Sequence, residues 1–153
     1  MYDSTYDTML HKNNIKKVLG EAIHELEYRM MTHDNSKLES PEKETYDTYI
    51  PLLKKVKYGT PEYDSLKKTM AENGLNHHFK MNSHHPEHYE NGIIDMDLFD
   101  LFEMFWDWYA ASLRSDTGFK DGLENNIEKY KIDEQIASIM RNTYDRYIEK
   151  KNK

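Results

Sequence analysis

Five of the eight histidines fall within twelve positions, in the segment HHFKMNSHHPEH, residues 77–88. A neutral imidazole offers one lone-pair nitrogen, and imidazoles are the commonest protein ligands for transition-metal ions. A cluster of this density predicts a metal site, and we expect His78, His84 and His85 to be ligands. His77 is the alternative to His78, because the spacing does not choose within an adjacent pair. The competing interpretation is a set of surface histidines, one of which caps a helix C-terminus.

An adjacent histidine and aspartate, His33 and Asp34, stand where a predicted helix ends. If the helix end turns both side chains inward, they can reach one metal ion. His11 lies on the apolar face of the same helix, where a lone histidine is often a satisfied core residue. A straight helix would hold His11 roughly 33 Å from His33, at about 1.5 Å per residue. Either the chain breaks near Gly20, or His11 is not a ligand.

Four carboxylates share one face of the otherwise apolar segment DMDLFDLFEMFWDWYAASLR. At 100° per residue they fall within about 120° of one another, and they are Asp97, Asp100, Glu103 and Asp107. A helix that is apolar on nearly all sides is buried, and a buried carboxylate must be paired, protonated or bound to metal. Asp107, in the middle of this helix, is therefore a candidate metal ligand. The alternative is that the stripe is the solvated edge of an amphipathic helix.

Helical periodicity dominates the rest of the chain. Apolar residues recur at i, i+3 and i+4, and no segment alternates convincingly with a period of two, so we predict an all-α fold. Ser40 is expected to cap the second helix with Pro41 at its first position, and Thr60 to cap the third. Pro51 predicts a kink in the second helix and Gly74 a weak point in the third. The predicted helices span about 5–31, 41–56, 61–81, 123–131 and 133–150, with one more that begins at Asp95 or Asp97 and ends at about 114.

Composition limits the class of protein. The chain has 153 residues, no cysteine and a formal net charge of −7. This length suits a single domain over residues 1–149, followed by a basic tail at 150–153 that frays. No apolar run approaches the roughly 20 residues of a membrane span, and no signal peptide is recognisable, so we expect a cytoplasmic protein. The acidic balance argues against nonspecific nucleic-acid binding, because phosphate contacts need clustered lysine and arginine.

The order of these candidate ligands resembles a known enzyme superfamily, the HD-domain metal-dependent phosphohydrolases. Their ligands follow the order His, His-Asp, Asp, and two-metal members add histidines between the His-Asp pair and the last aspartate. HDNSK at residues 33–37 is similar to the HDxGK of the HD-GYP branch, and HHPEHYENG at 84–92 is similar in position to its HHE segment. The resemblance implies a compact, single-domain helical bundle of the HD type. The chain has no GYP motif, so activity on cyclic-di-GMP does not follow.

A longer likeness is to a small uncharacterised bacterial and phage family, a domain of unknown function. Its members carry HDxSK, then a YGTxEY-like stretch, then HHxxxNSHHPEHYxNGIxxMDLFDLxEMxxDWxAA. In this chain those motifs stand at 33–37, 58–63 and 77–111. The likeness covers nearly the whole chain and brings no substrate with it. A phage-encoded member would act in the host cytoplasm.

The HD-type resemblance implies a phosphohydrolase in which one or two divalent ions of Mn, Fe, Co, Ni or Zn activate a water. The substrate would be a nucleotide or another small phosphorylated molecule. Lys37 would contact a phosphate oxygen, Glu87 or His88 would act as general acid, and Asn82 and Arg114 would hold the substrate. Glu103 and Asp100 would orient the metal ligands through hydrogen bonds.

Two other functions stay open on the sequence. Some HD-like proteins hold a di-iron site and activate O₂, so an oxygenase is one alternative. The other is a non-catalytic helical protein that binds a structural metal or sequesters a ligand. Many tyrosines on predicted exposed faces also leave self-association open.

Overall fold

The computed structural model describes residues 2–57, 60–114 and 118–152, and this part of the chain is helical with no strand. The all-α prediction is confirmed. The chain divides into two compact units, residues 1–35 and 36–153, and each is described by itself below. None of the helices within the described ranges is long and apolar enough to cross a membrane.

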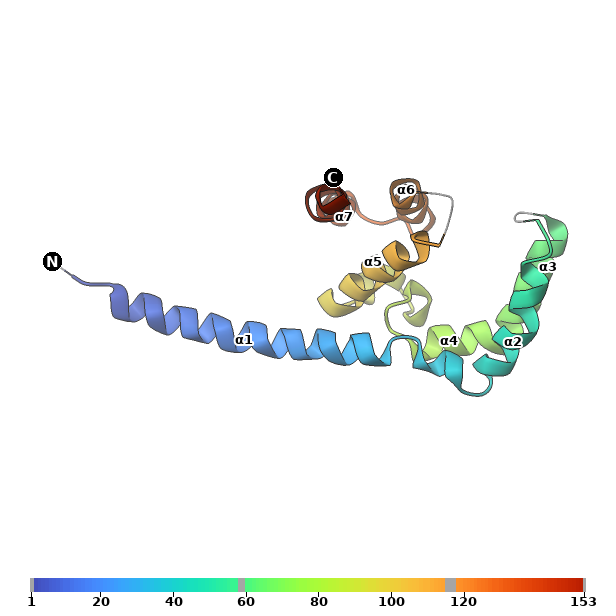
Figure 1. The fold of residues 1–153 in the computed structure, drawn as a ribbon, viewed down its shortest axis with the longest axis horizontal. Coiled ribbons are helices and arrows are strands. Elements are labelled where there is room, and N and C mark those ends of the chain that lie inside the picture. The colour runs from blue at the N-terminus through green and yellow to red at the C-terminus, as the bar shows by residue number, and fades with distance from the viewer. Residues whose placement is uncertain (1, 58–59, 115–117, 153) are drawn as a thin grey trace. The chain divides into compact units, whose positions relative to one another are not determined.

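The first unit is a single long helix, α1, Thr5–Thr32 (Figure 1). It agrees with the predicted span to within one residue, and it runs through Gly20 without a break. The backbone leaves the helix at His33, and Asp34 follows with φ of 57°, in the left-handed region. Aspartate and asparagine tolerate that region better than other residues with a side chain.

The second unit begins with the helix α2, Glu42–Leu53, which follows a cis peptide bond at Ser40–Pro41. The predicted start was wrong by one position, because Pro41 and not Ser40 precedes the first helical residue, and no side chain caps this end. Pro51 lies inside the helix, which continues to Leu53. The helix ends three residues before the predicted boundary at 56.

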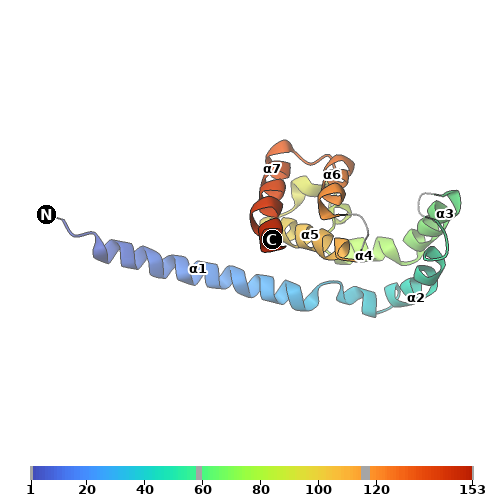
Figure 2. The ribbon, with the colours of Figure 1, turned by 45° about the horizontal axis from the view of Figure 1, so that its top comes forward.

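The next segment is helical to Met81, as predicted, with a wide π turn in its middle. It consists of α3, Pro61–Met70, the π turn Ala71–Leu75, and α4, Asn76–Met81. Thr60 caps α3 by accepting a hydrogen bond from the Tyr63 backbone N–H at 3.3 Å, which confirms that prediction. Gly74, the predicted weak point of this helix, lies in the π turn. The helix α2 lies beside α3 and this turn (Figure 1, Figure 2). Part of the predicted YGTxEY motif, residues 58–59, lies outside the described residues.

The remaining helices form the apolar core of the second unit. They are α5, Leu98–Ser112, α6, Phe119–Lys129, and α7, Glu134–Thr143, which continues in a π turn to Ile148 and a 3-10 turn, Glu149–Asn152. Asp97 and Asp133 cap α5 and α7 with their side chains. The predicted end of α5 was two residues too late and the predicted start of α6 four residues too late. The core consists of Met104, Phe105, Phe119, Leu123, Ile132, Ala137, Met140 and Ile148.

Candidate metal centre

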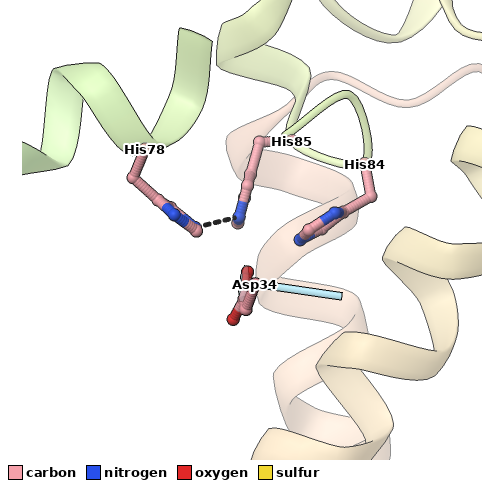
Figure 3. Close-up of side chains that lie close together, drawn as sticks. All are labelled: Asp34, His78, His84 and His85. Atoms are coloured by element: carbon pink, nitrogen blue, oxygen red, sulfur yellow. Dashed lines mark hydrogen bonds between the residues drawn. The ribbon is translucent and has the colours of Figure 1, made fainter. Parts of the chain in front are cut away.

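Three of the predicted histidine ligands come together within the second unit (Figure 3). His78 projects from α4, and His84 and His85 from the loop that follows it. Ligand nitrogens of the three rings all lie within 4.8 Å of one another, and Nε2 of His78 is 2.8 Å from Nε2 of His85. The side chains of His78 and His84 are almost fully buried, at 1 % and 2 % exposed.

A buried carboxylate fixes the orientation of His78. Glu42 is 0 % exposed, and its Oε2 lies 2.9 Å from Nδ1 of His78 and accepts a hydrogen bond from Oγ of Ser36 at 2.9 Å. Nδ1 of His77 lies 2.7 Å from the other oxygen. A carboxylate at Nδ1 keeps the proton there, so the lone pair of His78 is on Nε2, which points toward His85. This carboxylate–histidine pairing is the usual arrangement behind a metal-ligating histidine.

Sequence reasoning missed Glu42, and the fold explains why it reaches His78. Thr45, one turn further along α2, donates a hydrogen bond to the Asn73 carbonyl at 2.9 Å, so α2 lies against the π turn. A Cβ on Gly74 would meet the Thr45 Oγ1 at 2.5 Å. Only glycine allows the backbone of the π turn this close to the Thr45 side chain. In the sequence, Glu42 looks like any acid at a helix start, so no local signal marks it.

A second carboxylate anchors the loop that carries His84 and His85. Asp100, on the first turn of α5, is 2 % exposed and accepts hydrogen bonds from Ser83 Oγ at 2.6 Å and from the Tyr89 hydroxyl at 2.5 Å. Burial, together with the Asp100 carboxylate, raises the pKa of Tyr89 to about 12. The loop is thus bound to α5 on both sides of the histidine pair.

Two further predicted residues lie in the same network. Oε1 of Glu103 is 3.3 Å from Nδ1 of His84, the position expected for a carboxylate that orients a ligand ring. The amide nitrogen of Asn82 donates to Ser36 Oγ and to the His78 carbonyl, both at 2.8 Å. Asn82, predicted to hold substrate, therefore holds the histidine helix in place.

No group of candidate ligand atoms among the described residues includes Asp107 or His11. Among the residues that the structure describes, Asp107 is not in a group whose ligand atoms gather within 4.8 Å, and Glu103, one turn earlier on α5, faces His84 instead. Because α1 is unbroken, His11 is about 33 Å along the helix from His33, and one ion cannot bind both. Arg114 is exposed beyond the end of α5, about 16 Å along the helix direction from Glu103.

The predicted general acids face solvent and make other contacts. Glu87 accepts a hydrogen bond from the Tyr130 hydroxyl at 3.0 Å, and burial together with this carboxylate raises the pKa of Tyr130. Nδ1 of His88 lies 3.0 Å from the Phe79 carbonyl, so this ring ties the loop back to α4. The ammonium of Lys37 lies 5.4 Å from the centre of the Tyr46 ring. The centre of the Tyr46 ring is 6.2 Å from the centre of the His78 ring, so Lys37 lies near the edge of the histidine group.

His33 and Asp34 close the first unit. Nε2 of His33 lies 3.6 Å from Oδ2 of Asp34, so the two side chains face one another. Asn35 follows them as the last residue of this unit.

The chain belongs to the family of unknown function DUF5662, whose sequence model matches residues 1–150. No curated protein and no solved structure matches the chain. Nothing in these comparisons links the chain to the HD-domain superfamily.

Proposed function

We propose that this member of a family without a known function is a metal-dependent phosphohydrolase that acts on a nucleotide or another small phosphorylated substrate. One observation carries the proposal: His78, His84 and His85 present ring nitrogens within 4.8 Å of one another, with carboxylates behind two of the rings. Three protein ligands are typical of a catalytic metal site, because they leave positions open for water and substrate.

The donor set fits a divalent transition metal. Imidazole nitrogens with carboxylate support suit Zn, Mn, Fe, Co or Ni, whereas Mg²⁺ and Ca²⁺ prefer oxygen ligands. Nitrogens that share one ion lie about 3.0–3.4 Å apart, because each bond is about 2.0–2.1 Å long. The Nε2 atoms of His78 and His85 are 2.8 Å apart, so a small rotation of either ring brings them to that spacing.

His33 and Asp34 are the proposed source of the remaining ligands, and chain length supports this role. Asp34 stands two residues before Ser36, so their Cα atoms cannot be more than about 7 Å apart. Ser36 Oγ lies 3.4 Å from Nδ1 of His78, within the network that Glu42 organises. The left-handed backbone of Asp34 is a conformation often kept at functional sites.

The chain's own residues would divide the work of phosphoester hydrolysis. A bound divalent ion supplies a Lewis acid that lowers the pKa of a water and balances charge on phosphate oxygens. Glu42 and Glu103 hold His78 and His84 with their lone pairs directed inward. Lys37 carries the positive charge nearest in sequence to the Asp34 carboxylate, and it would meet a phosphate oxygen as a point charge.

A relationship to HD-domain phosphohydrolases is the finer part of the proposal. It is supported by the HDNSK motif at 33–37 and by the histidines that follow it. The last aspartate of that pattern would be Asp107, which does not lie in the histidine group. Glu103 takes the corresponding place on α5, one turn closer to the helix start.

Elemental analysis of the untagged protein tests the proposal. We expect one or two equivalents of transition metal in the wild type and a large loss in the His33→Ala/Asp34→Ala double variant. Metal-loaded protein is then assayed on nucleotides and small phosphoesters with Mn, Co, Ni and Zn. A protein that neither contains nor takes up metal would overturn the proposal.

Two other results would point to the alternative functions. Metal that is bound without any hydrolysis, at a site that admits no small anion, indicates a structural centre. Coloured or paramagnetic iron that consumes O₂ indicates an oxygenase.

A further inference from the structure

The hydroxyl of Ser36 joins three segments of the second unit. Ser36 is the first residue of this unit and lies in a 3-10 turn, Asn35–Leu38. Its Oγ donates a hydrogen bond to Oε2 of Glu42, on the first turn of α2, at 2.9 Å. The same oxygen accepts a hydrogen bond from Nδ2 of Asn82, which directly follows α4, at 2.8 Å. The hydroxyl uses its proton and a lone pair in these bonds, and it links the start of the unit to α2 and α4.

Both partners of Ser36 are held by further contacts. Glu42 is fully buried, and its other oxygen lies 2.7 Å from Nδ1 of His77. Nδ2 of Asn82 also donates to the His78 carbonyl at 2.8 Å. A 3-10 turn of four residues has poor hydrogen-bond geometry and does not fix its own position. The position of Ser36 is therefore set by α2 and α4.

Ser36 also stands next to the two ligands proposed from the first unit. Only Asn35 separates it from Asp34, which follows His33 directly. No residue of α1 is buried, so this helix supplies no core that could fix the pair. With Ser36 held, the Cα of Asp34 lies within about 7 Å of the Cα of Ser36. A tether this short gives the Asp34 carboxylate a high effective concentration around Ser36.

We propose that Ser36 is a positioning residue, whose hydroxyl holds the chain so that His33 and Asp34 complete the metal site. This inference rests on the proposed function, because it concerns the ligands that the three histidines leave to be supplied. Glycine, which HDxGK has at this position, would make neither of the two hydrogen bonds. The competing role for Ser36 is support of Glu42 alone, and loss of the hydroxyl would then weaken the hold on His78.

Metal affinities of the full chain separate these two roles. In the wild type, Ser36→Ala should lower the affinity for Co²⁺ about 10–100-fold, as loss of a residue that orients ligands typically does. In the His33→Ala/Asp34→Ala background the same change should lower it less than about threefold, because no ligand is then left for Ser36 to position. Ser40→Ala removes an exposed hydroxyl four residues further on and should leave the affinity unchanged. An equal loss in both backgrounds would overturn the inference and assign Ser36 to the support of Glu42.

The visible absorption spectrum of bound Co²⁺ is a second readout, because it depends on the number and geometry of the ligands. The Ser36→Ala spectrum should match that of His33→Ala/Asp34→Ala, and a spectrum like that of the wild type would overturn the inference. Circular dichroism checks folding. If Ser36→Ala does not fold, Asn82→Ala takes its place in both measurements, because it removes the other hydrogen bond of Ser36.

Two further results distinguish failure of this inference from failure of the proposed function. Equal Co²⁺ affinity in the wild type and in His33→Ala/Asp34→Ala would overturn the role of Ser36 and leave the three-histidine site intact. A wild type that binds no metal would overturn the proposed function and this inference together.

Discussion

Two kinds of histidine stand side by side in the segment 77–88, and the structure separates them by burial and by what lies behind the ring. His78 and His84 are buried, and a carboxylate oxygen lies within 3.3 Å of Nδ1 in each. His88 is exposed, and its Nδ1 lies near a backbone carbonyl. The sequence pattern is the same for all of them.

The difference shows that density of histidines indicates a site but does not choose its ligands. A ligand needs its free nitrogen directed at a shared point, and this requires an acceptor for the other nitrogen. In this chain the acceptors come from α2 and α5, which are distant in sequence from the histidines. The proposed ligand set therefore depends on how α2, α4 and α5 pack.

The largest expected effect comes from removing the buried rings. The His78→Ala/His85→Ala variant should retain no metal, because it keeps one imidazole of the three. His88→Ala should retain the wild-type metal content, and thermal unfolding of both variants shows whether they fold. Equal metal loss in the two variants would remove the distinction between buried and exposed histidines.

The Glu42→Gln variant should show a smaller loss. An amide cannot hold His78 as a carboxylate does, and loss of such a partner typically lowers metal affinity by about 10–100-fold. Glu44→Gln, on the exposed side of the same helix, is the control and should bind metal like the wild type. Competition with a chelator measures both affinities. Unchanged affinity in Glu42→Gln would mean that Glu42 stabilises the fold and does not support a ligand.

The sequence predicts the helices well because their signals are local. The periodicity and the Thr60 cap each depend on residues within a turn or two. The start of α2 was misplaced by one position, because Pro41 and not Ser40 precedes the first helical residue and no side chain caps this end. The acid stripe was correctly recognised as needing partners, and Asp100 has them.

The carboxylates could not be assigned in the same way. Helical spacing places Glu103 and Asp107 on one face but does not say which turn meets the loop of His84. Glu42 depends on a close contact between Thr45 and Gly74, which are 29 positions apart. Such contacts follow from packing between elements, and one sequence carries no record of them.

Gly74→Ala should disturb the contact that brings Glu42 to the histidines. The added methyl group would meet the Thr45 side chain, which two backbone carbonyls hold in place, so something must shift. Overpacking of this kind costs about 1–3 kcal/mol. Gly122→Ala is the matched control, because a Cβ there meets nothing within 4 Å, and it should raise stability by about 0.5–1 kcal/mol. Urea unfolding measures both, and a neutral Gly74→Ala would contradict the close approach.

The smallest expected effect is a dependence on pH at the anchor of the histidine loop. The pKa of Tyr89 is raised to about 12, so its phenol keeps the proton in the folded protein after the unfolded chain has lost it near pH 10. The stabilisation by Tyr89 is complete below about pH 10 and is lost as the pH rises toward 12. Tyr89→Phe lacks this group, so the wild type should be more stable than the variant at pH 8, and the gap should narrow above pH 10. Tyr28→Phe removes an exposed phenol on α1 and should follow the wild type. A gap that stays constant from pH 8 to 11.5 would mean that the Tyr89–Asp100 hydrogen bond does not anchor the loop.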